Sequence, residues 1–178
     1  MYPKAYIDYL VHFHGDRDYF ECHELLEEYW KDHDPGNKNS VWAAFIQLAV
    51  GSYHFRRGNI AGSSRTLNKA LASFKQRENE LARLGLNKNE FLSKLEAFIT
   101  TVETGRVYQS FVIPIHDPSL KEMCMEACLD KGFDWCKKDY TPSADIIDRH
   151  KSRDRSSVIF EREMALKKKH GSKEPSPE

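Results

Sequence analysis

The sequence predicts an all-α protein, namely a compact antiparallel bundle of about five main helices with a helical C-terminal extension. Apolar residues recur at helical spacing through most of the chain. The stretch from Val41 to Phe55 is apolar on nearly every side, which is typical of a buried helix and is too short to span a bilayer. The loops between the periodic segments are short, and short loops make consecutive helices antiparallel neighbours.

The first three helices are predicted for residues 3–13, 18–33 and 41–57. Pro3 suits the first turn of a helix, and the apolar stripe that follows it ends at a His-Gly-Asp break. The second helix has an apolar face formed by Cys22, Leu26 and Trp30, and it ends before a loop rich in Asp, Pro, Gly and Asn. The third is the buried helix, and Gly58 suits its C-cap.

Two further helices complete the predicted bundle. The fourth carries leucine, alanine and phenylalanine at helical spacing, and we expect it to run as far as about Leu84, where Gly85 stops it. Asn87 followed by Glu90 resembles a capping box, which starts a fifth helix that ends near Gly105.

The sequence changes character after Gly105. An apolar Phe-Val-Ile-Pro segment within residues 107–115 looks extended, and we expect it to lie across the bundle. Asp117 and Pro118 suit the N-cap and first position of a helix that ends at Gly132. Residues 133–142 look irregular, and residues 143–169 look helical but charged. We therefore expect a bundle domain over residues 1–105, an appended region over 106–169 and a disordered tail over 170–178.

The composition bounds the classes of function. The 178 residues include 27 basic and 27 acidic ones, and this balance argues against general nucleic-acid binding. No segment reads as a signal peptide or a transmembrane helix, so we expect no membrane role. Four cysteines in a chain of this length do not make a disulfide framework, and we expect free thiols that pack as small apolar groups. The expected location is the cytoplasm.

Polar side chains on two of the predicted helices indicate a site between them. Gln47, Gly51 and His54 share one face of the otherwise apolar third helix, and His23 and Glu27 share a face of the second. Buried polar groups need hydrogen-bond partners, so we expect the two polar faces to meet. The expected pocket is lined by His23, Glu24, Glu27, Trp30, Gln47, His54 and Asn59.

This set of side chains allows three kinds of site, namely a metal site, a catalytic site or a structural hydrogen-bond network. His23, Glu27 and His54 can bind a divalent metal ion such as zinc, iron or manganese. Beside such a metal, Glu24 can act as the base of a hydrolase-like enzyme. In the third case, the same groups hydrogen-bond to one another and rigidify the core. The string His-Glu-x-x-Glu lacks the second histidine of the His-Glu-x-x-His zinc proteases, and no phosphate-binding loop or nucleophile elbow is present. We therefore favour a non-catalytic pocket that binds a small ligand or is structural.

Two motifs on these helices carry a family resemblance. The first reads Tyr19-Phe20-Glu21-x-His23-Glu24-x-x-Glu27-x-x-Trp30, and the second reads Gln47-x-Ala49-x-Gly51-x-x-His54-x-x-x-Gly58-Asn59-x-x-Gly62. At this spacing they resemble the bacterial and archaeal family labelled domain of unknown function 309, over about residues 10 to 75. The resemblance implies a small all-α bundle and no assigned activity. The motif residues of the family fall on His23, Glu24, Glu27, Trp30 and His54.

Two other features indicate a partner-binding scaffold as a further alternative. Gly51, Ser63 and Ala70 match the spacing of one tetratricopeptide helix pair, although a solenoid needs about three repeats. A basic stretch near the C-terminus can contact an acidic partner, but interspersed acidic residues favour a solvated helix face. The basic residues are Arg149, Lys151, Arg153 and Arg155. A protein partner or a homo-oligomer is compatible with both features.

Overall fold

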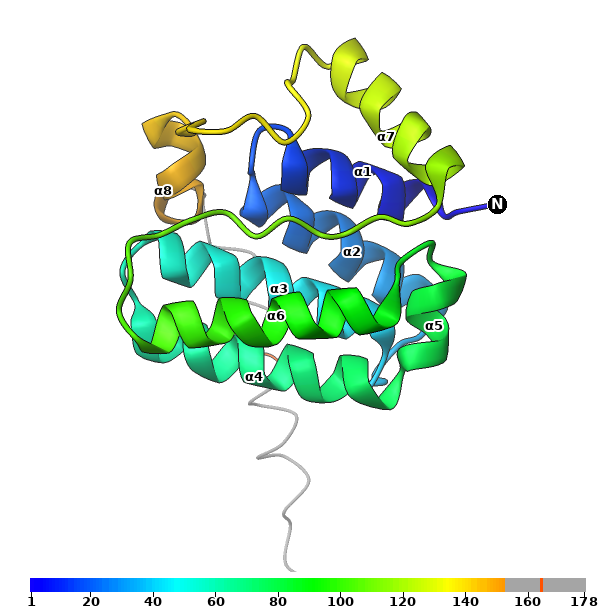
Figure 1. Cartoon of the computed structure of the whole chain (residues 1–178), viewed down its shortest axis with the longest axis horizontal. Helices are drawn as coiled ribbons and strands as arrows, with labels where there is room; N and C mark the ends of the chain where they lie inside the picture. Colours follow the sequence, from blue (N-terminus) through cyan, green and yellow to red (C-terminus); the bar gives the residue numbers. More distant parts are fainter. Residues whose placement is uncertain (153–163, 165–178) are drawn as a thin grey trace, which may run out of the picture. The chain divides into compact units, whose positions relative to one another are not determined.

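The protein is all-α in the residues that its computed structural model describes, which are 1–152 and Met164. The helices are α1 (Lys4–His14), α2 (Tyr19–His33), α3 (Val41–Arg56), α4 (Ile60–Gln76), α5 (Glu78–Arg83), α6 (Lys88–Glu103), α7 (Pro118–Asp130) and α8 (Ala144–Ser152) (Figure 1). The predicted fold class is confirmed, and α1, α2, α3, α4 and α6 are the five main helices.

The chain divides into two compact units, Met1–Ile147 and Asp148–Glu178. In the first unit, each of the helices α1 to α3 packs against its successor, α6 packs against α4, and α7 packs against α1 (Figure 1). This is the sequential packing that short loops favour. Among the described residues, no helix combines the length and the apolar composition that crossing a bilayer requires.

Helix α3 lies at the centre of the core, as its all-round apolar sequence predicts. Nine of its sixteen residues are buried. Phe45 meets Phe74 of α4 with ring centroids 4.9 Å apart, and Phe74 meets Phe91 of α6 at 4.8 Å, both edge to face. Edge-to-face pairs add stability beyond their buried area, so this row of rings ties α3, α4 and α6 together.

Helices α3 and α4 approach each other closely at a glycine. A Cβ atom on Gly51 would lie 2.5 Å from Leu67 Cγ, well inside van der Waals contact. At the same place the Ser63 hydroxyl donates a hydrogen bond of 2.8 Å to the Gly51 carbonyl oxygen. The small residues that the sequence places here therefore permit the close contact of the hairpin.

The fourth helix is shorter than its apolar spacing predicts. It ends at Gln76, and α5 starts after Arg77, whose backbone leaves helical geometry with φ −118° and ψ 27°. The Arg77 side chain donates to the carbonyl oxygen of Asn39 at 3.0 Å and to the Glu80 carboxylate at 3.1 Å. The break lets Leu81 and Leu84 turn into the core.

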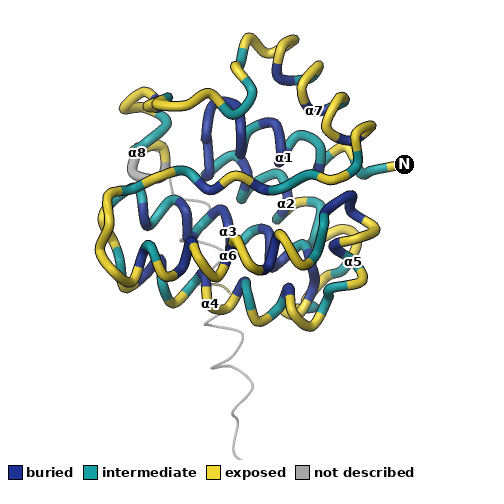
Figure 2. The backbone as a smooth tube through the Cα atoms, in the orientation of Figure 1, coloured by how far each residue is buried: buried dark blue, intermediate teal, exposed yellow. Residues whose placement is uncertain are grey.

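Residues 106–117 form an extended strap that crosses the bundle between α6 and α7, as the sequence predicts (Figure 1). Burial alternates along it, because Phe111 and Ile113 face the core and Val112 faces outward (Figure 2). The backbone N–H of Ile113 donates to His14 Nε2 at 3.0 Å, and a β-bridge pairs Leu86 with Ile115. Residues 106–130 thus share one hydrophobic core with residues 1–105.

Candidate functional site

Helix α2 carries the candidate site on the border of its buried face. The helix begins after Asp18, whose carboxylate accepts a 3.0 Å hydrogen bond from the Glu21 N–H and so caps the first turn. Cys22 and Leu26 are buried in the core. His23 and Glu27 each follow one of these core residues by one position, which leaves their side chains 28% and 33% exposed. The site is therefore open to solvent on one side.

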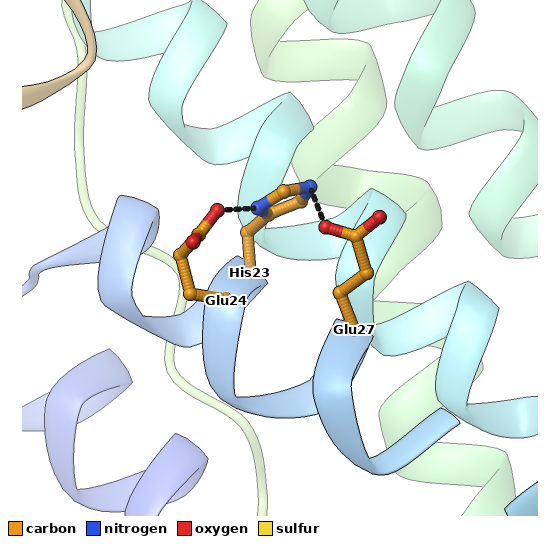
Figure 3. Close-up of side chains that lie close together, drawn as sticks. All are labelled: His23, Glu24 and Glu27. Carbon is orange, nitrogen blue, oxygen red and sulfur yellow. Dashed lines mark hydrogen bonds and ion pairs between the residues drawn. The ribbon is translucent and has the colours of Figure 1, made fainter. Parts of the chain in front are cut away.

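The imidazole of His23 lies between two carboxylates (Figure 3). Its Nδ1 is 3.1 Å from Oε1 of Glu24, and its Nε2 is 3.4 Å from Oε2 of Glu27. The other oxygen of Glu27 is 3.2 Å from the ammonium group of Lys31. Within residues 1–152 and Met164, this is the one group of three or more His, Cys, Asp or Glu side chains whose ligand atoms all lie within 4.8 Å of one another.

A neutral His23 ring cannot donate a hydrogen bond to both carboxylates. A neutral imidazole has one N–H donor and one lone pair. If Nδ1 donates to Glu24, the lone pair of Nε2 points towards the carboxylate of Glu27, and two electron-rich atoms face each other. A cation between them, either a proton or a metal ion, removes this repulsion. The geometry thus suits a cation at the Nε2 side of the ring.

Three of the other predicted pocket residues, Trp30, His54 and Asn59, have separate partners. Trp30 donates from Nε1 to the carbonyl oxygen of Asn37 at 3.1 Å, which fixes the loop after α2. Asn59 caps α4 through the Gly62 N–H, and its Nδ2 is 3.2 Å from His54 Nδ1. The structure therefore brings His23, Glu24 and Glu27 together, and it pairs His54 with Asn59.

Helix α3 also buries polar atoms of Gln47 and Ser52. The Gln47 Oε1 and Ser52 Oγ atoms are buried and have no hydrogen-bond partner in the described part of the chain. The expected meeting of the polar faces of α2 and α3 is thus not visible as a hydrogen bond of Gln47 Oε1, and Gln47 stays a predicted pocket residue.

The predicted basic stretch falls largely beyond the described residues. Arg149 is an exposed residue of α8, whereas Arg153 and Arg155 lie outside the residues described and only the backbone of Lys151 is described. The predicted tail over residues 170–178 also lies outside them.

The cysteines are free thiols, as predicted. Cys22, Cys124 and Cys128 are buried, and Cys136 is half-buried. Burial raises the pKa of Cys124 to about 12 and that of Cys128 to about 11. Such thiols stay protonated near neutral pH, so they pack as small apolar groups and are poor nucleophiles.

Sequence reasoning missed a second polar centre around Arg17 and Arg56. Arg17 lies in the loop between α1 and α2 with a positive φ of 52°, yet only 5% of it is exposed. Its carbonyl oxygen accepts a 2.7 Å hydrogen bond from Arg56 Nη1 at the end of α3. The sequence offered one signal. Arg17 lies between two aspartates in a loop of four residues, and so short a loop leaves little room for water around a guanidinium group.

Comparisons with known proteins give a matching family model and a matching relative. The family model named domain of unknown function (DUF309) matches residues 6–66, which contain most of α1, all of α2 and α3, the start of α4 and the His23 cluster. The uncharacterized protein YpuF of Bacillus subtilis (strain 168) is 41% identical over 174 residues, which cover 98% of this chain and 100% of the relative. No solved structure gives a significant match. The chain therefore belongs to the family of the domain of unknown function 309.

Proposed function

We propose that this protein is a non-catalytic helical-bundle protein that binds a divalent transition-metal ion, with His23 Nε2 and Glu27 as ligands. The observation that carries the proposal is the 3.4 Å separation between Nε2 of His23 and Oε2 of Glu27. Two ligand atoms that each lie about 2 Å from one ion are separated by about 3 Å. Small adjustments of the Glu27 side chain therefore suffice for both atoms to bind the same ion.

Glu24 supports this arrangement from the other side of the ring. Its carboxylate lies 3.1 Å from Nδ1, the nitrogen that faces away from Glu27. Histidines that bind metal commonly donate the second N–H to a carboxylate, which fixes the tautomer and the ring orientation. This position suits an orienting residue better than a base that acts on metal-bound water, so metal binding is favoured over the hydrolase-like alternative.

Titration with zinc chloride followed by calorimetry tests the proposal. The wild-type protein is expected to bind one zinc ion, and His23→Ala is expected to abolish this binding. His33→Ala is the matched control, because His33 is on the same helix but is exposed, with its Nδ1 2.9 Å from the Tyr29 carbonyl oxygen and its ring stacked on that of Tyr29. Equal zinc binding by wild type and His23→Ala, or no binding by wild type, would refute the proposal.

Three further variants assign the roles within the site. Glu27→Gln is expected to abolish zinc binding because it removes a ligand. Glu24→Gln is expected to weaken it by about 10- to 100-fold, the usual effect of changing a residue that orients a ligand. His54→Ala tests whether the predicted third ligand takes part, since loss of affinity in this variant would add His54 to the ligands.

A further inference from the structure

A pocket of about 800 Å³ lies in the first unit where five segments meet, and its volume is within the range of small-molecule sites. The segments are the α1–α2 loop, the end of α3, the strap, residues 136–142 after α7 and Ile147 of α8. The Cys136 N–H donates to the His14 carbonyl oxygen at 3.1 Å, which holds the last segment beside the end of α1 (Figure 1).

Two guanidinium groups line this pocket, and neither forms an ion pair with a carboxylate among the described residues. Arg17 donates from Nη2 to the Lys137 carbonyl oxygen at 2.7 Å and from Nη1 to the Tyr140 carbonyl oxygen at 3.4 Å. Arg56 lies over the ring of Tyr19, with Cζ 4.7 Å from the ring centroid. No Asp or Glu oxygen of the described residues lies within 4.0 Å of either guanidinium.

Part of the Arg56 guanidinium group makes no hydrogen bond among the described residues. Its Nε and Nη2 atoms are buried and have no hydrogen-bond partner among the residues described. Burying cationic donors without a partner lowers stability, because they lose their hydrogen bonds to water. An anion that accepts from these two nitrogens would remove this cost, and their fork geometry matches the oxygens of a phosphate or a carboxylate.

The acidic groups nearby already have other partners or lie apart from these donors. Asp16 accepts from the Asp18 N–H and contacts Nδ1 of His12 at 3.1 Å. Asp18 caps α2. Among the described residues of the lining, Asp139 is the one carboxylate, and it is accompanied by Lys137 and Lys138. The described lining therefore carries four cationic side chains and one anionic side chain.

Aromatic groups supply the remaining recognition surface. The hydroxyls of Tyr19 and Tyr108 are 2.7 Å apart, so one donates to the other and one O–H stays available. Burial raises the pKa of Tyr108, and the hydrogen bond with Tyr19 and the charges of Arg56 and Arg17 act in the opposite direction. Tyr108, Tyr140 and Val112 offer an apolar wall on the same pocket.

We propose that this pocket binds a small phosphorylated organic molecule, with its phosphate against Arg56, Arg17 and the Tyr108 hydroxyl and its ring or chain against Tyr108, Tyr140 and Val112. A phosphate is favoured over a carboxylate because its charge of up to about −2 matches two guanidinium groups. The site is separate from the His23 cluster and does not depend on metal binding there.

Phenyl phosphate is the probe that tests both halves of the proposal, with binding measured by calorimetry. Phenyl phosphate is expected to bind several-fold more tightly than inorganic phosphate, because the ring adds stacking contacts. Phenol and benzoate are expected to bind far more weakly than phenyl phosphate. Absence of phenyl phosphate binding at about 10 mM, or benzoate binding of equal strength, would overturn the assignment.

Variants locate the binding in the pocket. Arg56→Gln is expected to weaken phenyl phosphate binding about tenfold or more, since hydrogen bonds to a charged group are worth about 1.5–3 kcal/mol. Arg65→Gln is the matched control, because it removes one positive charge from an exposed site on α4. Unchanged affinity in Arg56→Gln would show that phenyl phosphate binds elsewhere and would overturn the proposal.

A second pair of variants decides the question if Arg56→Gln fails to fold. Val112 lines the pocket but is 46% exposed, so its replacement removes little from the core. Val112→Glu is expected to weaken phenyl phosphate binding and Val112→Lys to strengthen it, each by about twofold or more through the added charge. Equal affinities in the two variants would contradict a phosphate site at this position.

Discussion

His14 is the residue whose protonation most clearly couples to the fold. It is fully buried at the end of α1, where Nδ1 donates to the Leu10 carbonyl oxygen at 2.9 Å and Nε2 accepts from the Ile113 N–H at 3.0 Å. Only the neutral ring can do both. Burial lowers the pKa of His14 from 6.5 to about 4, with the charge of Arg17 acting in the same direction. His14 therefore ties the strap to α1 in a form that acid disrupts.

We predict that His14 makes the protein less stable in mild acid. Between pH 6.5 and about 4 the unfolded chain binds a proton at His14 and the folded protein does not, so the free energy of unfolding falls as the pH is lowered through this window. The pKa difference corresponds to about 3 kcal/mol. His14→Gln retains an acceptor for Ile113 but cannot titrate, so its loss of stability between pH 7 and pH 4 is expected to be smaller than that of wild type by about this amount.

Urea denaturation at several pH values measures this difference. His33→Gln is the control, because it replaces a histidine at an exposed position of α2. Parallel pH profiles for wild type and His14→Gln would show that the His14 ring is protonated without disturbing the fold, and would contradict the prediction.

At the level of elements, the α3–α4 hairpin depends on the absence of a side chain at Gly51. Glycine to alanine in an open helical position stabilises a protein by about 0.4–1 kcal/mol. Here the added Cβ would meet Leu67 at 2.5 Å, so Gly51→Ala is expected to lower the free energy of unfolding by about 1–3 kcal/mol instead. Thermal or urea denaturation measures the sign of the change. A loss of stability means that the contact leaves no room for a Cβ atom, and a gain would mean that it does.

A double-mutant cycle with Leu67→Ala identifies the cause. Leu67→Ala alone is expected to cost about 2–5 kcal/mol, because a fully buried leucine is truncated. In the double variant the new Cβ occupies space that Leu67 has left, so the combined cost is expected to be smaller than the sum by about 0.5–3 kcal/mol. Strict additivity would show that the destabilisation arises away from this contact.

Local signals explain which elements the sequence could predict. Asn87 and Asp117 cap α6 and α7 as expected, because a cap requires only residues three or fewer positions away. The break at Arg77 was not predictable, since its side chain bonds a carbonyl group of the distant Asn39. The same distinction holds for sites. His23, Glu24 and Glu27 lie within two turns of one helix, whereas the Arg17–Arg56 pocket exists only after five segments have come together.

At the level of the whole molecule, the core of the first unit is completed by residues well beyond the part matched by the family model. That match ends at residue 66, but the core cluster includes Phe111, Ile113 and Leu120. The strap and α7 cover α1, whose Tyr6 and Tyr9 are fully buried. The segments from α1 to α7 are thus expected to fold as one cooperative unit.

Two truncations test this expectation. A chain ending at Ile147 keeps the whole first unit, so it is expected to retain its helical circular dichroism per residue, with a midpoint of thermal unfolding within about 5 °C of the full chain. A chain ending at Gly105 loses the strap and α7 and exposes the aromatic faces of α1 and α6. It is expected to unfold without cooperativity or to aggregate, because each large apolar side chain left uncovered forfeits about 1.5–3 kcal/mol. A cooperative, monomeric 1–105 fragment would instead show that the strap and α7 are an attachment to a bundle that folds without them.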